Sequence, residues 1–390
     1  MEDRDGTSRM TRRDFLREAA AAAVLSAASP VLAADEPKDE SAEKTMKPAQ
    51  PTIPPRRCGF NIHNLFYYIE GGPFQEHDFR WMADWGFDFA RIPVAYTLIV
   101  QEADPHKPEP WFLAEVDRAV DFGQRYGVHI SLELHRAPGY PNANWQKEPY
   151  NLWKDESALE GFCFLWASLA ERYKGVPSSQ LSFDLVNEPP EIGEPTYNMS
   201  RADYDRVIGA ATRAIREVTP DRFVIAEGMT WGNIPCPELK DLGIGQSCHI
   251  YLPIELTHYR ASWMKGSDTW AEPIWPNLVS EGFYSLYGKG IVWNRERLEQ
   301  FYQPWFELAK QGVWVHCGEI GAYNKTPYPV VLAWFRDVLA MLKDHGIGFA
   351  LWNFRGEFGI LDSGRSDVDY EDFHGHKLDR KLLSLLQEFA

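Results

Sequence analysis

The sequence predicts an α/β fold, a single closed (β/α)8 TIM barrel, and three observations support this prediction. From residue 58 onward, short apolar, β-branched or aromatic runs are each followed by a loop and amphipathic stretches. Eight such runs occur, and strands that alternate with helices imply a parallel sheet. They occupy roughly 335 residues, which suits one such barrel. No glycine-rich phosphate turn follows the first run, which disfavours an open doubly wound sheet.

The expected elements can be placed by residue number. The expected strands are Cys58–Ile62, Phe87–Pro93, His129–His135, Leu181–Glu188, Arg222–Glu227, Gln246–Tyr251, Val313–Glu319 and Gly348–Phe354. Apolar residues at helical spacing predict helices at Trp111–Tyr126, Leu159–Tyr173, Ala202–Val218, Asn294–Lys310 and Pro329–Lys343. Residues 57–390 are therefore expected to form one catalytic domain.

Polar or reactive side chains stand at the ends of seven of these eight runs. They are Asn61, Arg91, His135, the pair Asn187 and Glu188, the pair His249 and Tyr251, Glu319, and the pair Trp352 and Asn353. The carboxyl ends of barrel strands meet on one face, where active sites are built. A single polar residue at a strand end is often only structural, but seven sets on one face predict a catalytic centre.

Glu188 and Glu319 are the two carboxylates that this face offers to catalysis. Two carboxyl groups can cleave a glycosidic bond, because one protonates the leaving oxygen while the other attacks the anomeric carbon. Their pKa values must then differ, so that the acid is protonated while the nucleophile is ionised. Arg91 near Glu319 is expected to keep that carboxylate ionised. Asn187 can hydrogen-bond a sugar hydroxyl beside the reacting carbon.

The motifs around these residues resemble glycoside hydrolase family 5, the cellulase family of clan A. The matching segments are Ala90-Arg91-Ile92-Pro93, Leu134-His135-Arg136-Ala137-Pro138-Gly139, Asp184-Leu185-Val186-Asn187-Glu188-Pro189, His249-Ile250-Tyr251, Gly318-Glu319-Ile320-Gly321 and Leu351-Trp352-Asn353-Phe354. A lone Asn-Glu-Pro is a weak signal. Eight family positions in order, each at a strand end, are specific, and the resemblance runs from about Gly59 to the C-terminus.

This resemblance implies a retaining glycosidase that works by double displacement. Glu319 would be the nucleophile and Glu188 the acid/base, with the carboxyl groups about 5–5.5 Å apart. It implies that Trp352 forms the sugar platform at the cleaved bond. The supporting residues would be Arg91, His135, Asn187, His249 next to the acid/base, and Tyr251 as a hydrogen-bond donor to the nucleophile. No metal or organic cofactor is expected, and the spacing of His249 and His258 does not suit zinc.

The sequence does not identify the sugar of the substrate. The loops after the third and sixth strands are expected to determine which sugar binds. They carry Tyr140, Trp145, Tyr150, Trp153, Trp263, Trp270, Trp275, Tyr284 and Tyr287. Most of these aromatic residues should pack the loops against the barrel, with at least one left as a platform for a sugar ring. Long loops on both sides could also wall the cleft into a pocket, which would favour exo-action or short oligosaccharides.

Three further residues are candidate substrate contacts, each with a structural alternative. Arg355 and Glu357 follow the eighth strand and could bind sugar hydroxyls or form an ion pair with each other. Asn61 could likewise contact the sugar or have only a structural role.

The expected partner is a β-linked oligo- or polysaccharide, with β-1,4- or β-1,3-linked glucose favoured. A mannanase or another β-glycosidase of the same clan is the alternative, and it differs in the sugar 2-hydroxyl contacts around Asn187. A non-catalytic carbohydrate-binding barrel is disfavoured because both carboxylates are present. The formal net charge of -16 disfavours nucleic acid as a partner. The oligomeric state is left open.

The N-terminal residues predict export. Residues 1–33 place Arg12-Arg13, an alanine-rich stretch and Val31-Leu32-Ala33 in the order of a twin-arginine signal, which implies a periplasmic or extracellular protein. The apolar stretch is too short for a membrane anchor, and residues 34–56 read as a solvated linker rich in proline and charge. The five cysteines fit no metal motif, and pairing of Cys236 is left open.

Overall fold

The computed structural model describes residues 54–66, 72–100, 108–141, 150–282 and 286–390. The expected leader and nearly all of the expected linker lie outside these residues. Pro55 and Arg56, at the end of the expected linker, contact the barrel. The carbonyl of Pro55 accepts a hydrogen bond from Trp314 Nε1 at 3.3 Å, and Arg56 Nε donates to the carbonyl of Ile347 at 3.1 Å.

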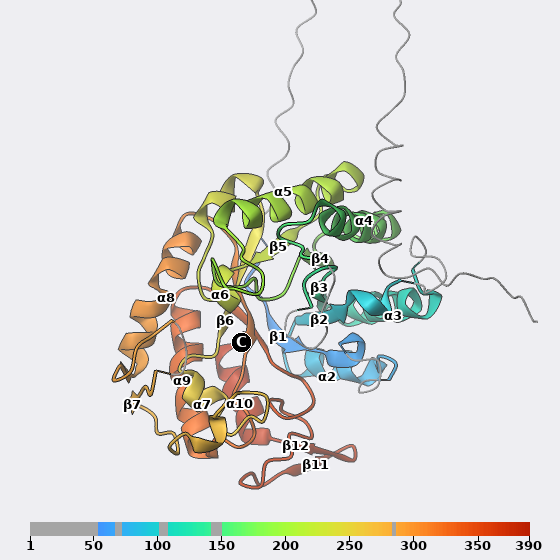
Figure 1. Cartoon of the computed structure of the whole chain (residues 1–390). Helices are drawn as coiled ribbons and strands as arrows, with labels where there is room; N and C mark the ends of the chain where they lie inside the picture. The colour runs from blue at the N-terminus through green and yellow to red at the C-terminus, as the bar shows by residue number, and fades with distance from the viewer. Residues whose placement is uncertain (1–53, 67–71, 101–107, 142–149, 283–285) are drawn as a thin grey trace, which may run out of the picture.

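Eight parallel strands close into a barrel, as predicted. They are β1 (Cys58–Asn61), β2 (Phe89–Ala95), β3 (His129–Arg136), β4 (Leu181–Asp184), β5 (Val224–Glu227), β6 (Gly245–Ile250), β9 (Val315–Ile320) and β10 (Gly348–Leu351). Their order is β1-β10-β9-β6-β5-β4-β3-β2, and pairing of β1 with both β10 and β2 closes the ring. Helices surround the strands in Figure 1.

The main helices lie where the hydrophobic spacing predicts them. They are α3 (Pro110–Tyr126), α4 (Glu156–Arg172), α5 (Arg201–Val218), α8 (Arg295–Lys310) and α9 (Tyr328–Asp344). Helix α5 shows the local cause. The Ser200 side chain accepts a hydrogen bond from the Asp203 backbone amide, and the Asp203 carboxylate accepts one from the backbone amide of Ser200. Residues such as Val207 and Ala211 are buried on one face.

The repeat of strand and long helix fails after the fifth and sixth strands. Strand β5 is followed only by the short helix α6 (Met229–Gly232) and the 3-10 helix η3 (Pro237–Leu242). Strand β6 is followed by α7 (Ile254–Thr257), η4 (Ser267–Thr269) and the β7–β8 hairpin (Leu278–Val279 with Val292–Trp293) before α8 begins. The long segment after β6 therefore has structure of its own.

Two elements that the hydrophobic pattern did not reveal lie side by side at one edge of the barrel. Helix α2 (Glu76–Asp84) precedes β2, while the antiparallel hairpin of β11 (Glu371–Phe373) and β12 (His376–Leu378) follows β10 (Figure 1). The Trp81 ring centroid lies 5.0 Å from that of Phe373 and 5.4 Å from that of His374. Helix α10 (Arg380–Phe389) then ends the chain.

The sequence raised two further questions, whether Cys236 forms a disulfide and whether a helix could span a membrane. All five cysteines are free thiols, Cys236 among them. Over the stretches of chain that the structure describes, no helix combines the length and the apolar character needed to cross a bilayer.

Candidate active site

A cleft of about 1310 Å³ opens at the carboxyl ends of the barrel strands. Seven of the residues predicted at strand ends reach it, namely His135, Glu188, His249, Tyr251, Glu319, Trp352 and Asn353. The structure therefore brings them to one face of the barrel. Arg91 and Asn187 lie beneath this surface, with exposed fractions of 1% and 0%.

Glu188 and Glu319 approach one another from β4 and β9. One carboxylate oxygen of each, together with a ring nitrogen of His249, lie within 4.8 Å of one another. Glu188 has a φ of 46°, a left-handed conformation that costs free energy in a residue with a side chain. Its backbone amide donates to Glu227 Oε2 at 2.7 Å, and its carbonyl accepts a hydrogen bond from the hydroxyl of Tyr140. The turn at Glu188 is therefore held from both sides.

Arg91 is the buried cation around which the carboxylates gather. Its Nη1 donates to Glu319 Oε1 and Asn61 Oδ1, both at 2.9 Å, and its Nη2 donates to Asn187 Oδ1 at 2.9 Å. The remaining partners are three carboxylates that line the interior, Glu133, Asp184 and Glu227. A buried guanidinium is stable only when it is paired in this way.

Glu227 is a buried residue of this site that the sequence analysis did not include. It ends β5, so the signal was present: the fifth run also ends in a reactive residue. Glu227 is completely buried, and its carboxylate meets Arg91 and, at 3.2 Å, His249 Nε2. Burial raises its pKa, but the charges of His249 and Arg91 outweigh that and lower the pKa overall.

Two hydrogen-bond donors hold the Glu319 carboxylate. The Tyr251 hydroxyl donates to Oε2 at 2.8 Å, while Arg91 binds Oε1. The preceding residue, Gly318, leaves no room for a side chain, because a Cβ atom there would lie 2.4 Å from Ser247 Oγ. The carboxylate is therefore fixed in orientation without any substrate.

The pKa of Glu319 results from burial and charge acting in opposite directions. Burial raises the pKa of Glu319 to about 7, although the charges of His249 and Arg91 lower it. Arg91 thus favours the ionised carboxylate, as expected, but the cost of removing the charge from water is the larger effect. Burial also lowers the pKa of His249, but Glu227, Glu319 and hydrogen bonds raise it well above its ordinary value.

His249 connects the two carboxylates. Its Nδ1 lies 2.9 Å from Glu188 Oε1 and 3.7 Å from Glu319 Oε2. A protonated His249 therefore faces acidic groups through both ring nitrogens, which explains why its pKa is raised despite burial. His135 differs, because burial and then Arg91 lower its pKa well below the ordinary value, so it is a neutral ring.

Trp352 presents a half-buried ring beside these groups. It follows β10, and its ring centroid lies 4.1 Å from that of His63 and 5.4 Å from that of His135, which stacks on it. Phe66 contacts both Trp352 and His135. The indole is thus fixed by three neighbouring rings and lines the cleft, as a stacking platform for a sugar ring requires.

The structure gives different outcomes for Asn61, Arg355 and Glu357, the three candidate substrate contacts. Asn61 is fully buried, and its amide nitrogen donates to the carbonyl of Gly318 at 2.9 Å while its oxygen accepts from Arg91. This position does not suit the expected sugar contact and supports the structural alternative. Arg355 and Glu357 both line the cleft but pair elsewhere, Arg355 with Asp78 and Glu357 with the hydroxyl of Tyr323.

Most of the loop aromatic residues pack against the barrel, as expected. Five of them are buried: Tyr140, Trp153, Trp270, Trp275 and Tyr287. Tyr150 is half-buried and packs against the core, while Trp145 and Tyr284 lie outside the described residues. Trp263 stands apart, because it is 49% exposed and lines the cleft. Its ring contacts Tyr323 and Phe358 at centroid distances of 4.9 and 6.2 Å.

Ligand atoms of Glu188, His249 and Glu319 also lie close enough together to share one metal ion. Both oxygens of Glu319 already accept hydrogen bonds from Arg91 and Tyr251, and both nitrogens of His249 face carboxylates. The raised pKa of His249 opposes metal binding, since imidazole must be neutral to bind a metal. The arrangement suits proton exchange better.

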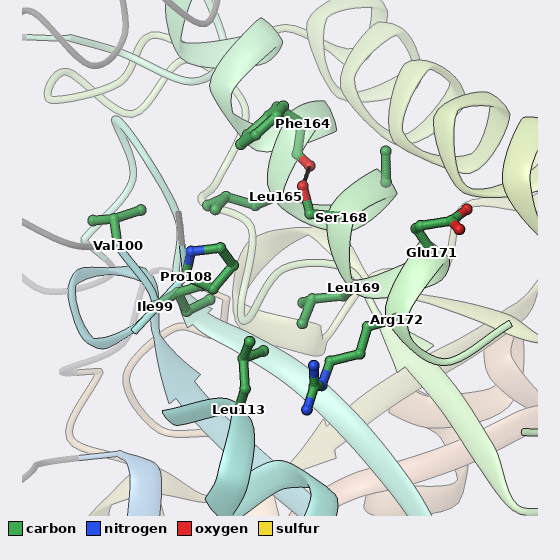
Figure 2. Close-up of a pocket in the computed structure, with 11 residues that line it drawn as sticks. Ile99, Val100, Pro108, Leu113, Phe164, Leu165, Ser168, Leu169, Glu171 and Arg172 are labelled. Carbon is green, nitrogen blue, oxygen red and sulfur yellow. Dashed lines mark hydrogen bonds between the residues drawn. The ribbon is translucent and has the colours of Figure 1, made fainter. Parts of the chain in front are cut away.

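A second cavity, of about 430 Å³, lies between α3 and α4 and differs in chemistry (Figure 2). Its walls are mainly apolar, with Ile99, Leu113 and Leu169 among them, and Glu171 is the sole carboxylate among the described residues that line it. One carboxylate cannot perform the paired chemistry described above.

Comparison with known proteins agrees with this geometry. Residues 56–357 match the model of Cellulase (glycosyl hydrolase family 5). Endoglucanase C of Acetivibrio thermocellus is 25% identical over 315 residues, which cover 76% of this chain and 88% of that protein. Cellodextrinase A of Ruminococcus flavefaciens is 24% identical over 308 residues, covering 75% of this chain and 80% of the relative.

Solved structures show the same fold. The crystal structure of a glycoside hydrolase, 40% identical in sequence, superposes with a TM-score of 0.79 and covers 85% of this chain and 99% of its own. Thermotoga maritima Cel5A bound to mannotriose is 22% identical, with a TM-score of 0.66, and covers 87% of this chain and 100% of its own.

Proposed function

This chain belongs to glycosyl hydrolase family 5 and is a glycoside hydrolase, and we propose that it cleaves β-linked glucans or gluco-oligosaccharides with retention. In this proposal Glu319 is the nucleophile and Glu188 is the acid/base. The supporting observation is their separation. Carboxylate oxygens within 4.8 Å of each other fit the spacing of retaining enzymes, about 5–5.5 Å, and leave too little room for the water that inverting enzymes place at about 6.5–9.5 Å.

The reaction takes two displacement steps. In the first, a Glu319 oxygen attacks the anomeric carbon while Glu188 gives its proton to the departing glycosidic oxygen, so a glycosyl ester forms and the shortened saccharide leaves. In the second, Glu188 takes a proton from water, the water oxygen attacks the same carbon, and Glu319 is released as a carboxylate. Arg91 and Tyr251 hold the Glu319 oxygens in place.

His249 supplies the proton arrangement that these steps need. It lies near both carboxylates, so one proton can be exchanged among His249, Glu188 and Glu319. When that proton resides on Glu188, Glu319 is ionised, and the acid and the nucleophile are both ready. The raised pKa of His249 keeps a proton available near neutral pH.

The proposed sugar is glucose. Support comes from the family and from the named activities of its relatives, an endoglucanase and a cellodextrinase. Trp352 would stack against the sugar at the cleaved bond, and Asn187 would face its 2-hydroxyl. Turnover of β-glucans and cellodextrins but not of mannans is expected, and the opposite ranking would favour the mannanase alternative.

The mechanism is tested with two variants and one product assay. Glu319→Ala and Glu188→Gln should each lower turnover of a β-glucan by about 10²-fold or more while the protein stays folded. Near-normal turnover in either folded variant would overturn the assignment. Early product examined by NMR should be the β-anomer, and initial α-anomer would indicate inversion instead.

We also propose that residues 1–33 direct export through the twin-arginine route and that residues 34 to about 56 link this leader to the catalytic domain. The support is the order of paired arginines, apolar stretch and small residues in the sequence. Replacing Arg12 and Arg13 together by lysine should abolish secretion. Unchanged secretion would contradict the proposal.

A further inference from the structure

Glu133 of β3 is a buried carboxyl group that the proposed mechanism does not use. It is 0% exposed and lies between Arg91 and His135, with its Oε2 3.3 Å from Arg91 Nη2 and 3.3 Å from His135 Nδ1. On the neighbouring strand β4, Asp184 is its partner in register. A carboxyl group in such a place either carries a buried charge or holds a proton, and its contacts show which.

Arg91 is close to Glu133 but gives all of its hydrogens to other residues. A guanidinium group has five N–H bonds. Those of Arg91 point from Nε to Asp184, from Nη1 to Asn61 and Glu319, and from Nη2 to Asn187 and Glu227. Glu133 therefore lies beside the cation without accepting a hydrogen bond from it, which is a poor environment for an ionised carboxylate.

The other surroundings of Glu133 also oppose a negative charge. Its Oε1 has no hydrogen-bond partner within the described part of the chain, and neither has Oγ of Ser131, two residues earlier on the same side of β3. Burial raises the pKa of Glu133 well above its ordinary value. Arg91 lowers this pKa, but three neighbouring carboxyl groups raise it further, those of Glu227, Asp184 and Glu319. A proton on Oε1 removes the charge and gives that oxygen a hydrogen to donate.

The neighbouring hydrogen bonds determine which nitrogen of His135 carries its hydrogen. Arg91 donates to Asn187 Oδ1, so the NH2 group of that amide faces His135 and donates to its Nε2 at 3.3 Å. His135 is neutral, because burial and then Arg91 lower its pKa well below the ordinary value. A neutral imidazole that accepts at Nε2 carries its hydrogen on Nδ1, which faces Glu133 Oε2. Oε2 is therefore an acceptor, and the proton of Glu133 belongs on Oε1.

We propose that Glu133 is a neutral carboxylic acid and a positioning residue, whose carbonyl oxygen keeps the hydrogen of His135 on Nδ1 and thereby holds the amide of Asn187. This inference rests on the proposed function, in which Asn187 faces the 2-hydroxyl of the sugar. Without an acceptor at position 133, the hydrogen of His135 moves to Nε2, where it opposes the NH2 group of Asn187. Since contacts with the 2-hydroxyl strengthen in the transition state, the loss should appear mainly in kcat.

Two substitutions separate the acceptor from the charge. Glu133→Leu offers no acceptor, so kcat for 2,4-dinitrophenyl β-cellobioside should fall about 10²-fold with a smaller change in KM. Glu133→Gln restores the acceptor and should have a kcat at least about tenfold above that of the leucine variant. Glutamine is also neutral, so the acidic limb of kcat/KM should stay in place. Equal kcat values in the two folded variants, or a limb about one pH unit lower in Glu133→Gln, would overturn the proposal.

Spectroscopy tests the protonation itself. At about pH 7, the infrared difference between the unaltered protein and Glu133→Gln should contain the C=O stretch of a protonated carboxyl group. Glu371→Gln, at an exposed position, is the control and should show only the loss of carboxylate bands. Nitrogen-15 NMR of the unaltered protein should find the hydrogen of His135 on Nδ1, and a hydrogen on Nε2 would overturn the proposal without any substitution. Failure of the unaltered protein to hydrolyse the cellobioside would instead overturn the proposed function, with both spectroscopic results unchanged.

Discussion

The backbone amide of Glu188 donates a hydrogen bond to Oε2 of Glu227 at 2.7 Å. The same buried carboxylate also meets Arg91 and His249. Glu227 therefore positions the proposed acid/base through its backbone and, at the same time, balances the two cations of the site.

Glu227→Gln should lower kcat by about 10²-fold while the protein stays folded. Glutamine keeps the size of the side chain but removes the charge that raises the pKa of His249. The pH profile should therefore shift as well, which a purely structural defect would not produce. Glu371→Gln, at an exposed position, is the control. A normal kcat with an unchanged pH profile would show that Glu227 is dispensable.

Activity should fall on the acidic side with an apparent pKa near 7. The pKa of Glu319 is raised to about 7, so below that pH the free protein carries a protonated carboxyl that cannot attack. The value belongs to Glu319 together with its neighbours, because their titrations interact. The dependence of kcat/KM on pH measures it. An acidic limb between about pH 4 and 5, as for an ordinary carboxylate, would contradict this prediction.

Tyr251→Phe should move that acidic limb to higher pH and reduce kcat/KM. The tyrosine hydroxyl donates to Glu319 Oε2, and a donor to a carboxylate favours the ionised form. Its removal therefore raises the pKa of Glu319 further. Tyr302→Phe tests the specificity of the effect, because Tyr302 donates to the backbone carbonyl of His249 and not to a carboxylate. A limb that stays in place in Tyr251→Phe would rule out this role for the hydroxyl.

Gly232→Ala should reduce both thermal stability and kcat. Gly232 ends α6 with a φ of 76°, and a Cβ atom there would lie 2.8 Å from the backbone nitrogen and Cγ of His249. The substitution must therefore strain the backbone or displace the histidine. Gly312→Ala is the control for strain alone, because its φ is 86° but a Cβ atom there meets nothing within 4 Å. Equal losses of kcat in the two variants would argue against displacement of His249.

Trp263→Ala should raise KM for oligosaccharides with little effect on thermal stability. The ring is 49% exposed within the cleft, so its removal mainly takes away a stacking surface, worth about 0.5–1.5 kcal/mol or up to about tenfold in KM. Trp111→Ala, 37% exposed on α3 and not among the residues that line the cleft, is the control. Equal KM changes in both variants would remove Trp263 from the binding surface.

The barrel could be predicted because its signals are local. Each strand appears as an apolar run, and each long helix has apolar residues at a spacing that survives in the sequence, as Val207 and Ala211 of α5 show. Helix α2 and the β11–β12 hairpin could not be found in this way. Their apolar residues face each other across almost 300 positions, as Trp81 and Phe373 do, so neither segment has a strong pattern by itself.

The sequence predicts most of the residues that form the site, but it does not predict their pKa values. The position of Glu319 at a strand end indicated where it would lie, yet its pKa depends on burial and on charges from four other strands. Asn61 shows the same limit, because nothing in the sequence tells whether an amide points into a cleft or toward Arg91. Glu227 could have been predicted, because it is the last residue of one of the expected strands.

The meeting of Arg355 with Asp78 has a consequence for how the protein is made. During synthesis, residue 78 leaves the ribosome long before residue 355, and β1 finds its partner β10 only when nearly the entire chain has emerged. A nascent chain therefore has neither a closed ring nor a complete binding surface. We expect catalytic competence to arise in a single late event, so that every partial product of translation is inert toward saccharides.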